Sequence, residues 1–343
     1  MIDNGFSLYN NIELAFGTPS SLSHWYRALP KTPYSSDPAF DNEVFIIYRE
    51  SLYKAQVELA CSKIFQKLMG YGSEVDIIKN DGSYYIVSRK IKNFISGCPL
   101  EHHNEIKGLA AIFILSYFLC ESDMHSGNYG FQNSAQEKKA FRIDLADALE
   151  RKMLEMPLTL EALNQLPYRA EEYYQGVCEL DLPRDYVNSE AFQYEKNEMI
   201  HCIAKTPSDV FETILRETIT EGFLVDYDDS DSIESDSDEE ESSYNPRVEQ
   251  LITLLKKRHD DWKNLILTGQ LYQDNRYASE EEFQMIIDSF KQYTDDISDN
   301  SEEEAQAYSP HAFFGKRVAE GERESDFSAK RSRTNLPSSS RIH

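Results

Sequence analysis

The sequence has few cysteines and no paired cysteine motif. Spacing of this kind argues against a cysteine-based zinc finger and against a dithiol redox site. An odd, scattered set predicts reduced, buried thiols in a cytosol-like compartment. The five cysteines are Cys61, Cys98, Cys120, Cys178 and Cys202.

Long apolar runs and a recognisable secretory leader are also missing. The most apolar run, Leu109–Cys120, has 12 residues, whereas a helix needs about 20 to span a bilayer. The first residues form neither a basic region nor an apolar one, which is not typical of a secretory signal. The sequence therefore predicts a soluble, cytosolic protein with no transmembrane segment.

Basic residues are scarce relative to acidic ones. The chain has 35 Lys and Arg against 60 Asp and Glu, which gives a net charge of −25. Such a surface repels nucleic acid and anionic lipid on average, so no nucleic-acid partner is expected. One basic feature stands out, because Lys316-Arg317 and Lys330–Arg333 are spaced like a bipartite signal for a nuclear import receptor. An uninformative tail is the alternative.

The hydrophobic pattern predicts a small α+β lobe followed by a helical lobe. Residues 1–43 are rich in turn clusters, and the segments after them alternate between strand and helix patterns. The expected elements are a strand at 43–50, a helix at 52–70, a hairpin at 74–91 with an Asp-Gly turn, a buried helix at 105–120, a hairpin at 129–146 and helices over about 150–223.

These patterns suggest boundaries for the parts of the chain. The first lobe is expected at about 1–95 and the second at about 96–225. Residues 226–241 contain ten acids and no base, so the segment 226–247 is predicted to be a disordered linker. Amphipathic helices are predicted at 248–294, packing on the helical lobe, and a disordered tail at 295–343.

Polar side chains gather directly behind the predicted buried helix. Asp123 and Asn128 stand five residues apart, and Asp144 follows 16 residues later at the end of an apolar strand. A hairpin between the last two would bring them side by side. Two carboxylates and an amide at one place suit phosphoryl transfer, with Mg²⁺ held by hard oxygen ligands.

These residues resemble a known signature. The segments "SDMHSGNYGF" and "FRIDLADAL" resemble the D-x-H-x-x-N loop and I-D-x-G strand of the phosphoinositide 3-/4-kinase-like branch of the protein kinase superfamily. HipA-type bacterial kinases and effector kinases of intracellular bacteria are similar. The resemblance implies a two-lobed protein-kinase-like fold that binds ATP and Mg²⁺. It makes Asp123 the catalytic acid/base, places His125 near the γ-phosphate, and makes Asn128 and Asp144 the metal ligands.

The resemblance also implies residues of the nucleotide site, with one departure. Glu58 matches the helix glutamate that pairs with the nucleotide-binding lysine, and Ser88–Ile91 matches the strand leading to the adenine hinge. That lysine is absent from "FIIYRE", so Arg49, Lys54 or Lys90 could take its role. Ala146 stands where the family has a glycine, two residues after the metal aspartate Asp144.

The same residues also allow purely structural interpretations. Asp123 and Asn128 could only close a turn, His125 could be structural, and Glu58 could be an ordinary exposed helix residue.

The leading functional prediction is an ATP-dependent phosphotransferase, an atypical kinase. A protein Ser/Thr substrate is slightly favoured over a phosphoinositide or inositol phosphate, because the net charge opposes an anionic membrane. The alternative is a catalytically silent kinase fold that binds a protein partner. Because the sequence resembles effector kinases, secretion of the protein into a host cell is a further expectation.

Overall fold

The computed structural model describes residues 4–17, 24–34, 37, 39–97, 105–135, 137–158, 163, 182, 184–220 and 246–267. All of them belong to one compact unit, Met1–Ser301. Several predicted features lie outside the described residues: the acidic segment 226–241, the helix at 279–293, the tail from 295 with its basic clusters, Cys98 and Cys178.

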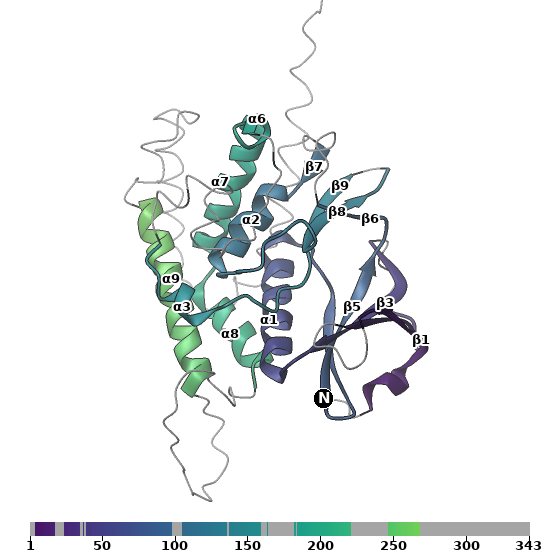
Figure 1. The fold of residues 1–343 in the computed structure, drawn as a ribbon. Coiled ribbons are helices and arrows are strands. Elements are labelled where there is room, and N and C mark those ends of the chain that lie inside the picture. Colours follow the sequence, from purple (N-terminus) through teal and green to yellow (C-terminus); the bar gives the residue numbers. More distant parts are fainter. Residues whose placement is uncertain are drawn as a thin grey trace, which may run out of the picture. The chain divides into compact units, whose positions relative to one another are not determined.

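The first lobe is built on a five-stranded antiparallel sheet in the order β1-β2-β3-β5-β4 (Figure 1). Its elements are the 3₁₀ helix η1 (Gly5–Leu8) and strands β1 (Tyr9–Phe16), β2 (Trp25–Pro30), β3 (Phe40–Arg49), β4 (Val75–Asn80) and β5 (Ser83–Ile91). The hairpin predicted from Asp81-Gly82 is confirmed, and both residues have positive φ, 49° and 80°, as a type I′ turn requires.

The sequence pattern did not predict strands β1 and β2, which lie in the segment expected to be rich in turns. Neither strand shows a clean alternation of apolar and polar residues, which hides the strand pattern. In β1 the reason is local, because Asn11 has φ 51° and the register with β2 shifts between Asn10 and Glu13. Such an irregularity breaks the two-residue period along the strand.

Helix α1 (Leu52–Met69) matches its prediction closely, and its ends show why. The Ser51 side chain accepts a hydrogen bond from the amide of Lys54 at 3.2 Å, which satisfies a free N–H of the first turn. Gly70 ends the helix with φ 74° and donates to the carbonyl of Gln66 at 2.9 Å. Only glycine adopts that conformation without strain.

The buried helix and the second hairpin also form. Helix α2 (Leu109–Phe118) is buried along its whole length. It starts later than the pattern suggested, because Gly108 has φ 82°; the Glu195 carboxylate accepts from the amides of Gly108 and Ala110 at 2.6 and 3.1 Å. A four-stranded sheet, in the order β6-β8-β9-β7, lies beside the helices: β6 (Phe94–Ser96), β7 (Ile106–Lys107), β8 (Tyr129–Asn133) and β9 (Lys138–Arg142).

The remaining described helices build the second lobe around α2. They are α3 (Arg151–Leu154), α6 (Arg184–Val187), α7 (Glu190–Lys205), α8 (Ser208–Thr218) and α9 (Pro246–Leu267). Helix α7 packs on α2 and α9, and α8 packs on α1 and α9 (Figure 1). One hydrophobic core runs from Val57 in α1 through α2 to Ile266 in α9.

The predicted α+β architecture is therefore confirmed: a sheet with one helix comes first, and helices with a small sheet follow. Helix α9 is the first of the helices predicted at 248–294, and it begins two residues earlier, at Pro246. Within the described ranges, no helix combines the length and apolarity needed to cross a bilayer.

Candidate functional site

The loop that follows α2 is closed by its own polar groups. Asp123 Oδ2 accepts a hydrogen bond from Asn128 Nδ2 at 2.7 Å, and the Asp123 carbonyl accepts a second from the same nitrogen at 3.1 Å. The amide of Asn128 donates to the carbonyl of His125 at 2.9 Å. Turn chemistry thus explains part of the reason why these residue types stand here, but it leaves Asp144 unexplained.

His125 is oriented by the same loop. Its Nδ1 accepts a hydrogen bond from the amide of Gly127 at 2.9 Å, so in the neutral ring the proton is on Nε2. That nitrogen lies 3.6 Å from Asp123 Oδ1, and the two side chains are 36% and 35% exposed. The imidazole and the carboxylate therefore lie side by side, where a substrate can reach both.

The hairpin of β8 and β9 brings the end of this loop next to the predicted metal aspartate. The amide of Ile143 donates to the carbonyl of Asn128 at 2.8 Å, directly beyond the cross-strand pair of Tyr129 and Arg142. Asp144 follows with φ 58°. Aspartate enters this left-handed region more readily than most residues, and such strain concentrates at functional sites.

Arg49 connects three separate parts of the chain. It is the last residue of β3, and its Nε donates to Glu58 Oε2 on α1 at 2.6 Å. Its Nη2 lies 2.8 Å from Oδ1 of Asp144. The guanidinium therefore forms ion pairs with two carboxylates that were predicted to belong to one site. Glu58 is only 2% exposed, so the reading of Glu58 as an ordinary exposed helix residue is wrong.

The other two candidates for the missing lysine lie elsewhere. Lys54 forms a short ion pair with Asp147, not with Asp144. Lys90 pairs with Glu43 at 2.6 Å. Of the three basic residues considered from sequence, Arg49 is therefore the one that contacts both Glu58 and Asp144.

Ser88 and Lys90 lie toward the far end of β5 from this cluster. Arg49 stands opposite Tyr84 in the sheet, whereas Ser88 stands opposite Phe45. The structure thus separates these two predicted nucleotide-site residues from Arg49 along the sheet.

Burial dominates the electrostatics of Glu58. Removal from water raises the pKa of its carboxyl group to about 7, although the neighbouring Arg49 guanidinium acts in the opposite direction. The negative charge of Asp144 raises the pKa of Glu58 further. Burial lowers the pKa of the Arg49 guanidinium, but the charges of Glu58 and then Asp144 outweigh it, so that this pKa is raised. Arg49 is therefore firmly cationic, while the Glu58 carboxyl titrates near neutral pH.

Two residues beneath the loop were missed by the sequence analysis. The side chains of Glu121 and Arg142 are both 0% exposed, and Arg142 Nη2 lies 3.1 Å from Glu121 Oε2. Burial raises the pKa of Glu121, and Arg142 opposes that rise. A signal was present, because Glu121 follows an apolar run directly and Arg142 stands inside one, and a charge buried at such a place requires a partner.

The donor set suits a hard cation, although no close cluster is preformed. In the part of the chain that is described, no three His, Cys, Asp or Glu side chains gather tightly enough to hold a metal ion. Asp144 is 40% exposed and so accessible from solvent. Its carboxylate and the amide oxygen of Asn128 are the ligand types that Mg²⁺ prefers. Binding there must compete with Arg49 for Asp144 Oδ1.

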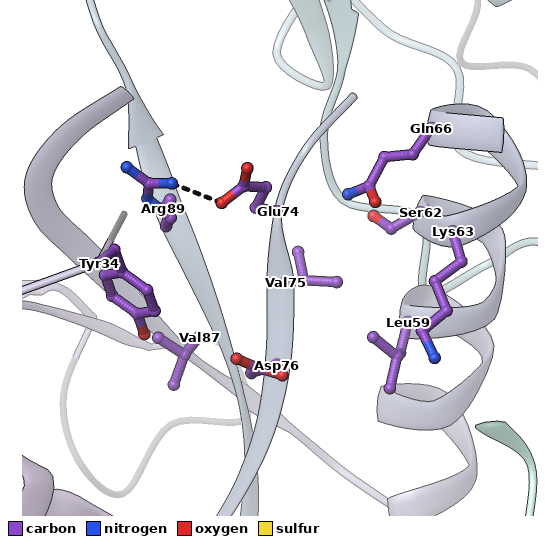
Figure 2. A pocket seen from close by; sticks show the side chains of 10 residues that line it. All are labelled: Tyr34, Leu59, Ser62, Lys63, Gln66, Glu74, Val75, Asp76, Val87 and Arg89. Atoms are coloured by element: carbon purple, nitrogen blue, oxygen red, sulfur yellow. Dashed lines mark hydrogen bonds and ion pairs between the residues drawn. The ribbon is translucent and has the colours of Figure 1, made fainter. Parts of the chain in front are cut away.

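A cavity of about 300 Å³ lies apart from these residues, between α1 and strands β4 and β5 (Figure 2). The Arg89–Glu74 ion pair forms one wall of it, with a distance of 2.6 Å. None of the predicted site residues lines this cavity. The candidate site is therefore the cluster around Arg49 and Asp144 rather than this pocket.

Comparisons with known proteins give distant similarities only. No protein-family model matches the chain, and no curated protein matches it significantly. A Helicobacter pylori proinflammatory kinase, CtkA, is similar in structure over 79% of this chain and 99% of its own, with 10% identity and a TM-score of 0.43. A chain from the Shewanella oneidensis MR-1 complex of HipA, HipB and operator DNA is similar over 72% of this chain and 67% of its own, with 9% identity and a TM-score of 0.36.

Both of these structures are of bacterial proteins. Similarities at these identities and TM-scores carry no information about function, whereas the geometry of the site does.

Proposed function

We propose that this chain is an atypical kinase, an ATP-dependent phosphotransferase that moves the γ-phosphate of ATP to a hydroxyl group. The observation that carries the proposal is the bridge formed by Arg49, which pairs with Glu58 at 2.6 Å and with Asp144 at 2.8 Å. In protein kinases a strand cation paired with a helix glutamate and an aspartate that binds the metal are both needed for transfer. Here both contacts converge on one guanidinium.

The nucleotide phosphates would contact Arg49. A guanidinium offers several donors in a planar fork that matches phosphate oxygens. The buried Glu58 on α1 holds that fork in place, because its Oε2 lies 2.6 Å from both Nε and Nη2 of Arg49 and so fixes the direction of the arginine side chain. Arg49 can therefore take the phosphate-pairing role of the missing lysine without any other basic residue of β3.

The loop supplies the group that acts on the acceptor. Asp123 and His125 lie side by side and about a third exposed, so an acceptor hydroxyl can approach the carboxylate. In the transfer, the hydroxyl oxygen forms a bond to the γ-phosphorus and the bond from that phosphorus to the ADP oxygen breaks. The hydroxyl proton passes to Asp123. The hydrogen bond from Asn128 Nδ2 holds this carboxylate in place.

Mg²⁺ would be held by Asp144 and by the amide oxygen of Asn128, and would supply charge neutralisation at the phosphates. The side chain of Asn128 now donates its Nδ2 to Asp123, which leaves its oxygen available as a ligand. Asp144 needs to loosen its contact with Arg49 as Mg-ATP enters, and the phosphates offer the guanidinium a new anionic partner.

A protein hydroxyl is the favoured acceptor. Among the residues directly after Asp144, the basic ones are Arg151 and Lys152, and Arg151 is already paired with Glu155 at 2.9 Å. Little positive charge is therefore left near this segment for a lipid phosphate. The net charge of −25 also opposes approach to an anionic membrane.

A catalytically silent kinase fold is the second candidate. The Arg49–Asp144 ion pair favours it, because a carboxylate held by a guanidinium is a weaker ligand for a cation. In that case ATP would bind, or the fold would only bind a protein partner, without transfer of phosphate.

One experiment separates the two. The full chain is incubated with γ-labelled ATP, Mg²⁺, a cell lysate and a panel of phosphoinositides, beside the Asp144→Ala variant. Label on protein bands that is absent with the variant supports the proposal, and label on lipid instead changes the acceptor class. A thermal shift with Mg-ATP but no label in any fraction supports the silent fold.

A further inference from the structure

The guanidinium of Arg142, beneath the site, donates hydrogen bonds to three backbone carbonyl groups. Arg142 is the last residue of β9, and its Nη2 donates to the carbonyl of Asp123 at 2.9 Å. Its Nη1 makes short hydrogen bonds to the carbonyls of Asn128 and Ile143. Ile143 directly precedes Asp144, so a single guanidinium is bound to the backbone at or beside each of the three residues that the proposed reaction needs.

Glu121 completes this arrangement from the opposite side. Its Oε1 accepts a hydrogen bond from the amide of Asp123 at 3.0 Å, while Oε2 lies 3.1 Å from Arg142 Nη2. The last contact is an ion pair rather than an aligned hydrogen bond, since Oε2 has no hydrogen-bond partner among the described residues. Asp123 is thus held at its N–H by Glu121 and at its carbonyl by Arg142.

Stability alone does not account for a pair of this kind. Taking two charges out of water is costly, and well-packed apolar residues of similar size usually stabilise a fold as well or better. Apolar side chains cannot accept from an amide or donate to three carbonyls, however. What the pair adds is therefore the fixed position of the loop backbone relative to the strand that leads to Asp144.

We infer that Glu121 and Arg142 are positioning residues that set the distance between Asp123 and Asp144 for phosphoryl transfer. This inference rests on the proposed kinase function. Transfer depends on placing the acceptor hydroxyl in line with the γ-phosphate, and a displacement of about 1 Å can cost about 10²-fold in rate. Neither residue has to touch ATP or the acceptor for this effect.

The test replaces both charges together, so that no unpaired charge stays buried. The double variant Glu121→Met with Arg142→Met should fold and bind Mg-ATP with a dissociation constant within a few-fold of the wild type. Its kcat should fall by about 10²-fold. The control is Arg216→Met with Glu249→Met, which removes an ion pair between α8 and α9, outside the loop, and should keep the wild-type kcat.

A second variant covers the case in which the double variant does not fold. Arg142→Lys keeps a positive charge beside Glu121, but an ammonium group cannot bind three carbonyls in the planar geometry of the fork. The melting temperature of Arg142→Lys should be close to that of the control variant. Its kcat should still fall, and its dissociation constant for Mg-ATP should stay unchanged. A folded variant of either kind that turns over at the wild-type rate would overturn the inference.

Hydrogen exchange separates this inference from the kinase proposal. In the wild type the amide of Asp123 is bonded to Glu121, so its exchange should be slow and should speed up in the double variant, but not in the control. If the wild type transfers no phosphate, the kinase proposal fails while faster exchange still supports the positioning role. Unchanged exchange of this amide would refute the positioning role even if the enzyme is active.

Discussion

Arg49 and Asp144 are 95 positions apart in the sequence, and their side chains meet at 2.8 Å. The contact joins the first lobe to the segment after β9, and Glu58 on α1 pairs with the same guanidinium at 2.6 Å. A cation in this position can serve the nucleotide phosphates, but it also occupies one oxygen of the proposed metal ligand. The nucleotide phosphates and Asp144 therefore compete for Arg49.

Arg49 should control nucleotide affinity, whereas Lys54 should not. Arg49→Met removes the fork and leaves Glu58 without its partner, so the dissociation constant for Mg-ATP should rise at least ~10-fold, as expected for the loss of a charge-assisted contact. Lys54→Met is the matched control, because Lys54 pairs with Asp147 near the surface. Isothermal titration with a non-hydrolysable ATP analogue measures both. Equal affinities in the two variants would remove Arg49 from the phosphate site.

Asp144 should be needed for transfer but not for folding. Asp144→Asn keeps the size and tolerates the φ of 58°, so the melting temperature should stay near that of the wild type while labelled phosphate transfer is lost. Asp144→Ala should be less stable than Asp144→Asn by about 1 kcal/mol, because alanine is less favourable in the left-handed region. Full activity in Asp144→Asn would exclude a metal-ligand role for this residue.

Asp123→Asn separates chemistry from loop closure. The Asn128 side chain donates to the Asp123 carboxylate, and an asparagine oxygen at the same position can still accept that hydrogen bond. The loop should therefore keep its shape and Mg-ATP should bind normally. Turnover at saturating Mg-ATP should fall at least ~10²-fold, because the group that takes the acceptor proton is gone. If turnover is the same in both proteins, Asp123 only closes the turn.

The stability of the fold should depend on pH through Glu58. Burial raises the pKa of its carboxyl group from 4.5 to about 7, so between these values the folded state keeps a proton that the unfolded chain has lost. The free energy of unfolding should therefore fall as pH rises through this window, by an amount on the order of 3 kcal/mol from this residue.

The matched variant for that prediction is Glu58→Gln, which cannot ionise. Urea denaturation at pH 5 and pH 7.5 should show a steeper loss of stability in the wild type than in the variant. Other buried carboxyl groups with a raised pKa, such as Glu121 and Glu195, act equally in both proteins and cancel in the difference. The same slope for the two proteins would mean that Arg49 keeps Glu58 ionised throughout.

The local elements could be read from the sequence because their causes are local. Ser51 and Gly70 end α1 by side-chain capping and by a left-handed backbone, and Asp81-Gly82 sets the turn between β4 and β5. The unbroken apolar run of α2 required burial whatever surrounded it. Strand β1 could not be read in this way, since the left-handed Asn11 and the register shift interrupt its alternation.

The sequence by itself determined which polar residues stand at the ends of α2 and β9, and the hairpin between them follows from its short turn. Only the tertiary structure decided which cation meets Asp144, because Arg49, Lys54 and Lys90 each carry one positive charge and the packing of the chain determines where each charge lies. The same holds for Glu121 and Arg142: a charge inside an apolar run or directly after one predicts a partner, but the identity of the partner depends on how β9 packs beneath the loop. Ion pairs between distant segments follow from the packing of whole lobes, and no short-range periodicity records that packing.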